Sequence, residues 1–252
     1  MINNDSYLAR PPAIINPRQR LCFEAVSFSI NSIATDILSI QAVVAGHPVS
    51  PDNIKDFEPI KKISLCSSLW SIVDQTHMPR NILKELKVGA PYIDGFISKY
   101  DVARRMRNSM DHIHSQLANI INSKQSRPTV FGSLSYFVFN SVARTERGKQ
   151  YGFSVVVHFG NLTDKKQNFH LANPVGRQVR DGISLFKFSA FDHTLLIDEL
   201  YDDIQQLANN LELLLKQRVN VEMGRLKGQG IDTDALIAQP ASFMAIVKIE
   251  KE

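Results

Sequence analysis

The sequence predicts an α+β protein: a helical bundle with an antiparallel β-sheet inserted between its third and fourth long helices. Three observations support this fold class. Apolar residues recur at steps of three and four over three segments in the first half of the chain, as the buried stripe of an α-helix does. The period then changes to two, which is typical of strands. A last apolar seam at helical spacing follows over residues 196–214.

An irregular arm, residues 1–16, precedes the first helix, because prolines punctuate this segment. Pro17 suits the first turn of a helix, and an apolar seam follows over residues 23–44. We expect this helix to end at Gly46, since a glycine just past the last seam residue is a common C-terminal signal.

The second and third helices repeat this pattern. A seam over residues 63–77 predicts the second helix. Pro79 is expected to break or kink it, because proline lacks the N–H that a helix interior needs. The third helix is expected to run as one helix from about Tyr92 to Ile121, on a stripe of apolar residues at the same spacing.

The sheet is expected at about residues 129–190. Residues 129–143 alternate in the manner of a strand, and residues 153–159 and 183–188 are strand-like as well. Glycines separate these segments, so several short strands in series predict an antiparallel sheet. Its apolar face must be covered by the bundle or by a second subunit.

The fourth long helix follows the sheet, and Asp192 is a good N-cap for it. The predicted helical core therefore spans residues 17–223 and includes the sheet as an insertion. Residues 224–252 form a C-terminal tail, in which residues 243–249 could make a short strand.

The composition is that of an ordinary globular protein, with 44% hydrophobic and 21% charged residues among 252. The net charge of +4 permits a polyanionic partner without requiring one. Cys22 and Cys66 make neither a disulfide framework nor a zinc motif. We see no signal peptide and no apolar run long enough to cross a bilayer, so we expect a cytoplasmic protein without membrane contact.

Several common chemistries lack their sequence motif. The chain has no Gly-rich phosphate loop and no dinucleotide fingerprint, and it has no Gly-x-Ser-x-Gly elbow. His112 and His114 are two residues apart on a predicted helix, so they point to nearly opposite sides and cannot bind one metal ion. We therefore expect neither a cofactor nor a metal site.

One group of residues suggests a reaction: Arg107, Asn108 and His112, on the third predicted helix. Asn108 and His112 are four residues apart and share a face of the helix. Arg107 and His112 are separated by five steps of about 100°, which places them roughly 140° apart. They can act on one group only if the long Arg107 side chain reaches round or if the helix deforms locally.

With this motif the sequence resembles the HEPN superfamily, in which an Arg, a polar residue, three further residues and a His stand late in a long helix of a helical bundle. The resemblance covers about residues 17–123, with the helix at 192–222 as a further candidate; the sheet is not part of the usual core. It implies a metal-independent endoribonuclease acting as a homodimer, with two motif helices lining one groove. It also implies toxin–antitoxin or antiphage defence, with RNA as substrate and an antitoxin or regulatory protein as a further partner.

The resemblance implies catalytic roles for Arg107, His112 and Asn108. The imidazole would exchange protons with the ribose 2′-hydroxyl or the leaving oxygen, and the guanidinium would hold the scissile phosphate. Asn108 would orient the imidazole or a phosphate oxygen, and the product would carry a 2′,3′-cyclic phosphate. Some relatives have a Tyr two residues after the His; this chain has His114 there, so it lacks any regulation that needs the Tyr hydroxyl.

Other residues could bind the substrate. Arg104 and Arg105 flank the motif and could contact phosphates, as could the neighbouring His114; a solvated charged face explains them equally well. His77, on the second helix, could contact RNA if that helix lines the groove. Its position on the apolar seam favours a packing role instead.

Two other interpretations stay open. Arg107 and Asp111 could be an ordinary i,i+4 surface pair beside an exposed His112. Alternatively, the chain could be a non-catalytic HEPN-like module that binds RNA or another protein with the same helices and cleaves nothing.

Overall fold

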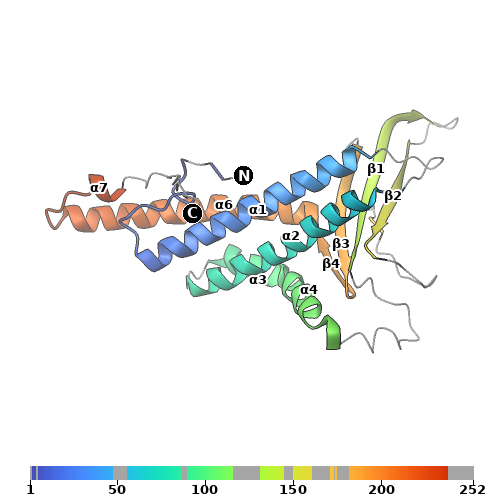
Figure 1. The fold of residues 1–252 in the computed structure, drawn as a ribbon. Helices are drawn as coiled ribbons and strands as arrows, with labels where there is room; N and C mark the ends of the chain where they lie inside the picture. The colour runs from blue at the N-terminus through green and yellow to red at the C-terminus, as the bar shows by residue number, and fades with distance from the viewer. Residues whose placement is uncertain are drawn as a thin grey trace, which may run out of the picture.

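The fold in the computed structural model is mixed α+β, as the sequence predicts: long helices and a small four-stranded antiparallel sheet. Figure 1 shows three long helices side by side, with the sheet across one end of them. The structure describes residues 2–3, 5–47, 56–86, 90–115, 131–144, 150–160, 171–172, 174 and 182–237.

The first long helix, α1 (Pro17–Ala45), forms as predicted. The side chain of Asn16 caps its start by accepting a hydrogen bond from the Arg18 N–H at 2.9 Å. At its other end the Gly46 N–H donates to the Ala42 carbonyl at 3.0 Å. The apolar seam of this helix is buried against its neighbours.

By length and composition alone, α1 could also span a membrane. The mean hydropathy of its most apolar 18-residue window is 1.4, and 39% of that window is buried. The expectation that no segment is apolar enough for this is therefore wrong. Because the core helix of a soluble protein meets the same criterion, the cytoplasmic location stays a prediction.

The second helix, α2 (Pro59–Glu85), continues through Pro79, so the break considered for this residue does not occur. Proline removes one backbone hydrogen bond from a helix interior. Thr76, Arg80 and Leu83 are buried on both sides of Pro79. Their packing holds the helix together where local propensity alone would weaken it.

The third predicted helix is in fact two, α3 (Pro91–Lys99) and α4 (Asp101–Asp111), so the prediction of one continuous helix is wrong. The backbone leaves helical geometry at Tyr100 (φ −97°, ψ 21°). It does so again at His112 (φ −106°, ψ 19°), where α4 ends. Residues 116–121 of the predicted helix lie outside the described residues.

Arg80 of α2 explains the break between α3 and α4. In a continuous helix the Ile97 carbonyl would accept the Asp101 N–H. Here it accepts Arg80 Nε at 2.9 Å, while Arg80 Nη2 donates to Asp101 Oδ1 at 2.8 Å. The Arg80 side chain is only 4% exposed. One buried guanidinium therefore holds the end of α3 and the start of α4 against α2.

The sheet is antiparallel, as predicted, and its strand order is β2-β1-β3-β4. Strand β1 pairs with both β2 and β3, and β4 covers the free side of β3. The sheet packs across the end of the helices, where Phe131, just before β1, meets α2: Trp70 Nε1 donates to the Phe131 carbonyl at 3.1 Å. The strands are β1 (Ser133–Arg144), β2 (Gln150–His158), β3 (Gly182–Ala190) and β4 (His193–Leu196).

Asp192 does not cap the last long helix, so that prediction is wrong. It lies in the two-residue turn between β3 and β4, where Phe191 and Asp192 have φ of 49° and 62°. Such a hairpin turn requires positive φ at both central residues, and aspartate tolerates it. The helix α6 (Ile197–Lys227) begins directly after β4 and has no side-chain cap.

The C-terminal part of the described chain is helical for longer than the sequence predicts. The helix α6 includes Gly224 and ends at Gly228, and the short helix α7 (Asp234–Ile237) follows. The strand expected over residues 243–249 lies outside the described residues.

The N-terminal arm is irregular, as expected, and it is attached to α6 through Glu212. The Glu212 carboxylate accepts the backbone N–H groups of Tyr7 and Leu8 at 3.2 and 2.8 Å. Lys216 lies 3.3 Å from the same carboxylate. Because Leu8 is also buried, at 1% exposure, polar and apolar contacts together fix the arm.

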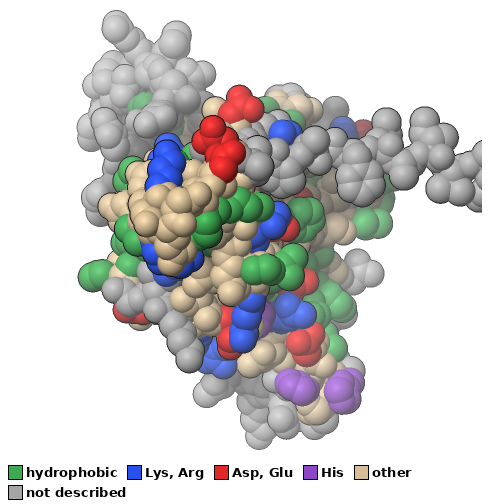
Figure 2. All heavy atoms as spheres, turned by 90° about the vertical axis from the view of Figure 1, so that its left-hand side faces the viewer, with side chains coloured by type: hydrophobic (Ala, Val, Ile, Leu, Met, Phe, Trp, Pro, Cys, Tyr) green, Lys and Arg blue, Asp and Glu red, His purple; other side chains and the backbone are tan. Residues whose placement is uncertain are grey.

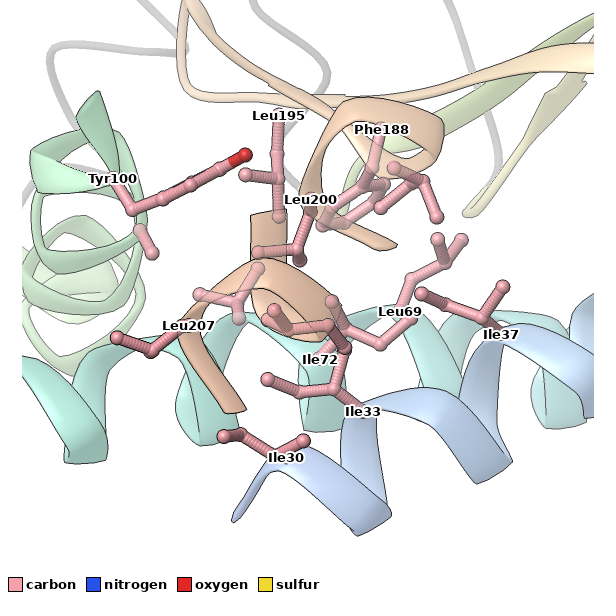
Figure 3. Close-up of a cluster of buried hydrophobic side chains, with 14 of the residues drawn as sticks. Ile30, Ile33, Ile37, Leu69, Ile72, Tyr100, Phe188, Leu195, Leu200 and Leu207 are labelled. Carbon is pink, nitrogen blue, oxygen red and sulfur yellow. The ribbon is translucent and has the colours of Figure 1, made fainter. Parts of the chain in front are cut away.

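The hydrophobic core lies where the helices meet the sheet (Figure 3). Trp70 joins the two layers, since its ring lies 5.4 Å from that of Phe188 in an edge-on arrangement. The side chains that point into this core come from α1 (Ile33, Ile37), α2 (Leu69, Ile72), α6 (Leu200, Leu207), β3 (Phe188) and β4 (Leu195).

Arg80→Met should lower the free energy of unfolding by about 3 kcal/mol, because it leaves Asp101 and the Ile97 carbonyl without their buried donor. Arg18→Met is the matched control. Arg18 pairs with Glu85 at the same 2.8 Å, but the two side chains are 78% and 62% exposed, so the loss should stay below about 1 kcal/mol. Urea unfolding measures both. Equal losses of unfolding free energy in the two variants would contradict a larger stabilising role for the Arg80–Asp101 pair.

Candidate functional site

The motif residues lie toward the C-terminal end of α4. Ala103 and Met106 are fully buried and face the rest of the protein. Arg107 is 41% exposed, and Asn108 and His112 are exposed. The groups expected to act on RNA are therefore accessible to a large substrate.

His112 is the C-cap residue of α4. Its N–H donates to the Asn108 carbonyl at 3.2 Å, and its own carbonyl accepts the Ser115 hydroxyl at 2.8 Å. The backbone leaves helical geometry at His112 itself and is regular from Arg107 to Asp111, so no local deformation turns the two side chains toward each other. Among the described contacts of a single chain, none joins these two side chains.

Arg107 makes two weak ion pairs, one to α2 and one within α4. Its Nε lies 3.5 Å from Asp74 Oδ1 and 3.7 Å from Asp111 Oδ2. Both distances exceed an ordinary hydrogen bond, and the two carboxylates are 54% and 59% exposed. The Arg107–Asp111 surface pair, which the sequence offered as an alternative to a catalytic role, is therefore present. Pairs of this kind contribute little to stability, so a phosphate can replace them at small cost.

His77 of α2 lies close to Arg107. Burial lowers the pKa of the half-buried His77 imidazole; the positive charge of Arg107 lowers it further, and Asp74 opposes the shift. Its Nε2 is 3.2 Å from Asn81 Nδ2, and its Nδ1 is buried without a hydrogen-bond partner among the described residues. The structure thus brings His77, a predicted substrate contact, to the catalytic candidate Arg107.

Arg104 and Arg105 gather around one carboxylate. Arg104 Nε lies 2.9 Å from Asp101 Oδ1, and Arg105 Nη1 lies 3.0 Å from Asp101 Oδ2. The hydrogen bond from Arg104, with the charges of Arg80 and Arg105, lowers the pKa of Asp101 to about 2. The side chains of Arg104 and Arg105 remain 44% and 51% exposed, so they can also contact a phosphate.

His114 lies beyond the end of α4 and is exposed. Figure 2 views the end of the molecule opposite the sheet; on this face basic and acidic side chains are intermingled, and histidines lie at its lower edge. Over the ranges that the structure describes, no three His, Cys, Asp or Glu side chains group closely enough to hold a metal ion.

Sequence reasoning missed the two residues that position α4, Arg80 and Asp101. A signal for Arg80 was present: it continues the apolar seam of α2, three residues after His77, at a place where a charged residue must find a buried partner. Asp101 carried no comparable signal, because an acidic residue is common in the first turn of a helix.

No protein-family model matches this chain, and neither does any curated protein or any solved structure. The resemblance to the HEPN superfamily therefore rests on the motif and on its setting among long helices.

Arg107→Gln should raise the pKa of His77, because it removes a positive charge that disfavours the imidazolium ion. Arg105→Gln is the matched control. After burial, Arg105 is the main cause that lowers the pKa of His193, and it has no part in the shift of His77, so this variant should raise the pKa of His193 alone. NMR titration of the imidazole protons follows both residues. An unchanged His77 in Arg107→Gln would contradict the contact between α2 and α4.

Proposed function

We propose that this protein is a metal-independent endoribonuclease of the HEPN type, in which Arg107 and His112 of two copies form one composite site. The observation that carries the proposal is the joint exposure of Arg107, Asn108 and His112 at one end of α4, where the ion pairs of Arg107 with the described residues are long and half-exposed. A cytoplasmic location belongs to the same proposal. So does a role as a toxin or antiphage effector under an antitoxin or regulatory protein.

Arg107 would bind the scissile phosphate. A guanidinium presents two parallel N–H donors that match two phosphate oxygens, and it stays charged at any physiological pH. Asp74 and Asp111 hold the side chain over α4 at 3.5 and 3.7 Å, which limits its freedom before RNA arrives. As negative charge grows on the phosphate during attack, the same contact strengthens and lowers the barrier.

His112 would move the protons. An imidazole takes the proton from the ribose 2′-hydroxyl, the 2′-oxygen bonds to phosphorus, and the bond from phosphorus to the 5′-oxygen of the next nucleotide breaks. A second imidazolium donates a proton to that leaving oxygen. The products are a 2′,3′-cyclic phosphate and a 5′-hydroxyl, and no water, electron or other reactant is consumed.

Two copies are required by the geometry of this reaction. The attacking and leaving oxygens lie on opposite sides of phosphorus, so one imidazole cannot serve both at the same time. Each chain supplies a single His112 in the motif, and a two-fold axis beside α4 would bring a second one opposite it. Arg104 and Arg105 would then flank the groove from both copies and contact phosphates on either side.

His112→Ala and Arg107→Ala should each lower the rate of RNA cleavage by roughly 100-fold or more, because each removes a group that acts in the transition state. Arg18→Ala, which removes an exposed arginine of α1, is the matched control and should cleave like the wild type. His114→Ala should raise KM more than it lowers kcat, since His114 is placed as a substrate contact. Cleavage of a labelled RNA in excess chelator measures all four.

Equal cleavage by the wild type and both motif variants would mean that another site or a contaminant cuts the RNA. Retained RNA binding without cleavage by the wild type would favour the non-catalytic module. A protein that stays monomeric at micromolar concentration, measured by analytical ultracentrifugation with RNA present, would overturn the composite site.

A further inference from the structure

A pocket of about 310 Å³ lies between α3 and α6, and one of its walls is left open by Gly95. Glycine weakens a helix, and the backbone of Gly95 does not have the positive φ that would require it. An added Cβ would meet no atom within 4 Å, so packing does not require glycine either. The missing side chain keeps the pocket open to a ligand. Its volume lies at the small end of the range for ligand sites.

The inner wall of the pocket is apolar and buried. Phe96 and Leu207 are 6% and 2% exposed, and Leu207 belongs to the core drawn in Figure 3. Tyr92, one turn before Phe96 on α3, is half-buried, and burial raises the pKa of its hydroxyl, so the ring stays uncharged. Two aromatic residues one turn apart, with Leu207 opposite them on α6, suit a planar ring.

The outer wall offers hydrogen bonds. Gln206 and Asn210 are four residues apart on α6, so their amides project from the same face over the pocket. Among the described residues, neither amide has a hydrogen-bond partner. Side-chain amides carry a donor and an acceptor side by side, which matches the N6 and N7 edge of adenine.

Lys99 adds a positive charge at the end of the pocket. Its Nζ lies 2.7 Å from Asp203 and 3.3 Å from Glu199, and the side chain is 46% exposed. The hydrogen bond to Asp203, in particular, raises the pKa of Lys99, so the ammonium group stays charged. Asp203 is itself held by the Tyr100 hydroxyl at 2.5 Å. Because two carboxylates pair with this one ammonium group, the end of the pocket suits an uncharged ring more than a phosphate.

We propose that this pocket binds an adenine base of single-stranded RNA, with the ring against Tyr92 and Phe96 and its edge on Gln206 and Asn210. This inference rests on the proposed function and deepens it. It specifies that the RNA substrate carries an adenine at some distance from the phosphodiester that is cleaved. Single-stranded RNA is recognised chiefly through bases that stack on aromatic side chains and bond along their edges. A free adenine nucleotide offers the same chemistry, and the experiment separates the two sources.

The pocket lies close to the motif along the chain. Lys99 is the last residue of α3 and Arg107 lies in α4, eight residues further on across the break at Tyr100, so their backbones are at most roughly 29 Å apart. An extended strand of a few nucleotides covers this distance. One RNA can therefore place a base in the pocket and a neighbouring phosphate at Arg107.

The test compares two leucine substitutions at open helical glycines. Gly95→Leu fills the pocket. Gly224→Leu, in α6, adds the same side chain at a position that is also free of neighbours within 4 Å and does not line the pocket. Both variants carry His112→Ala so that no probe is cut. Fluorescence anisotropy with short labelled oligoadenylate and oligouridylate should show about 10-fold weaker oligoadenylate binding for Gly95→Leu only. Circular dichroism confirms that both variants are folded.

AMP that binds the His112→Ala protein but not its Gly95→Leu variant, while oligoadenylate binds both alike, would assign the pocket to the free nucleotide and overturn the proposal. Displacement of the labelled probe only by oligoadenylate would assign it to the RNA chain. Equal binding of the two oligonucleotides, or equal loss in both glycine variants, would overturn the proposal. Because binding is measured without cleavage, adenine-specific binding by a protein that cuts no RNA would reject the nuclease and leave the pocket standing.

Discussion

One buried guanidinium positions the part of the molecule that carries the motif. Arg80 donates to the Ile97 carbonyl and to Asp101, and so occupies the place where two helices would otherwise be one. A buried charge is costly unless its donors are satisfied. The direction of α4, and with it the location of Arg107 and His112, therefore depends on a residue that contacts neither of them.

The same region shows why charge alone does not make a nucleic-acid site. Arg80, Arg104 and Arg105 all point to Asp101, and Arg107 lies between Asp74 and Asp111. These carboxylates orient the guanidinium groups and reduce the net field that a distant polyanion would meet. Recognition of RNA would then depend on close, directional contacts more than on long-range attraction.

The regular parts of the fold were predictable because the spacing of apolar residues indicates which side chains are buried. This spacing predicts the buried seam of α1, the strands and the buried seam of α6. Tertiary contacts decided the rest: Arg80 divides α3 from α4, buried neighbours carry α2 through Pro79, and the turn at Asp192 takes a residue that resembled a helix cap. An exposed His112 was one interpretation of the sequence. Its place at the end of α4 and the effect of the Arg107 charge on the pKa of His77 depend on tertiary structure that the sequence did not reveal.

The attachment of the N-terminal arm has a consequence for the order in which the chain acquires structure. Tyr7 and Leu8 bond to Glu212, a separation of about 200 residues. Contacts so distant along the chain form late, because the intervening segments must be ordered before the loop can close. During synthesis the arm therefore emerges well before the helix to which it binds, and its apolar Leu8 stays exposed until α6 has formed.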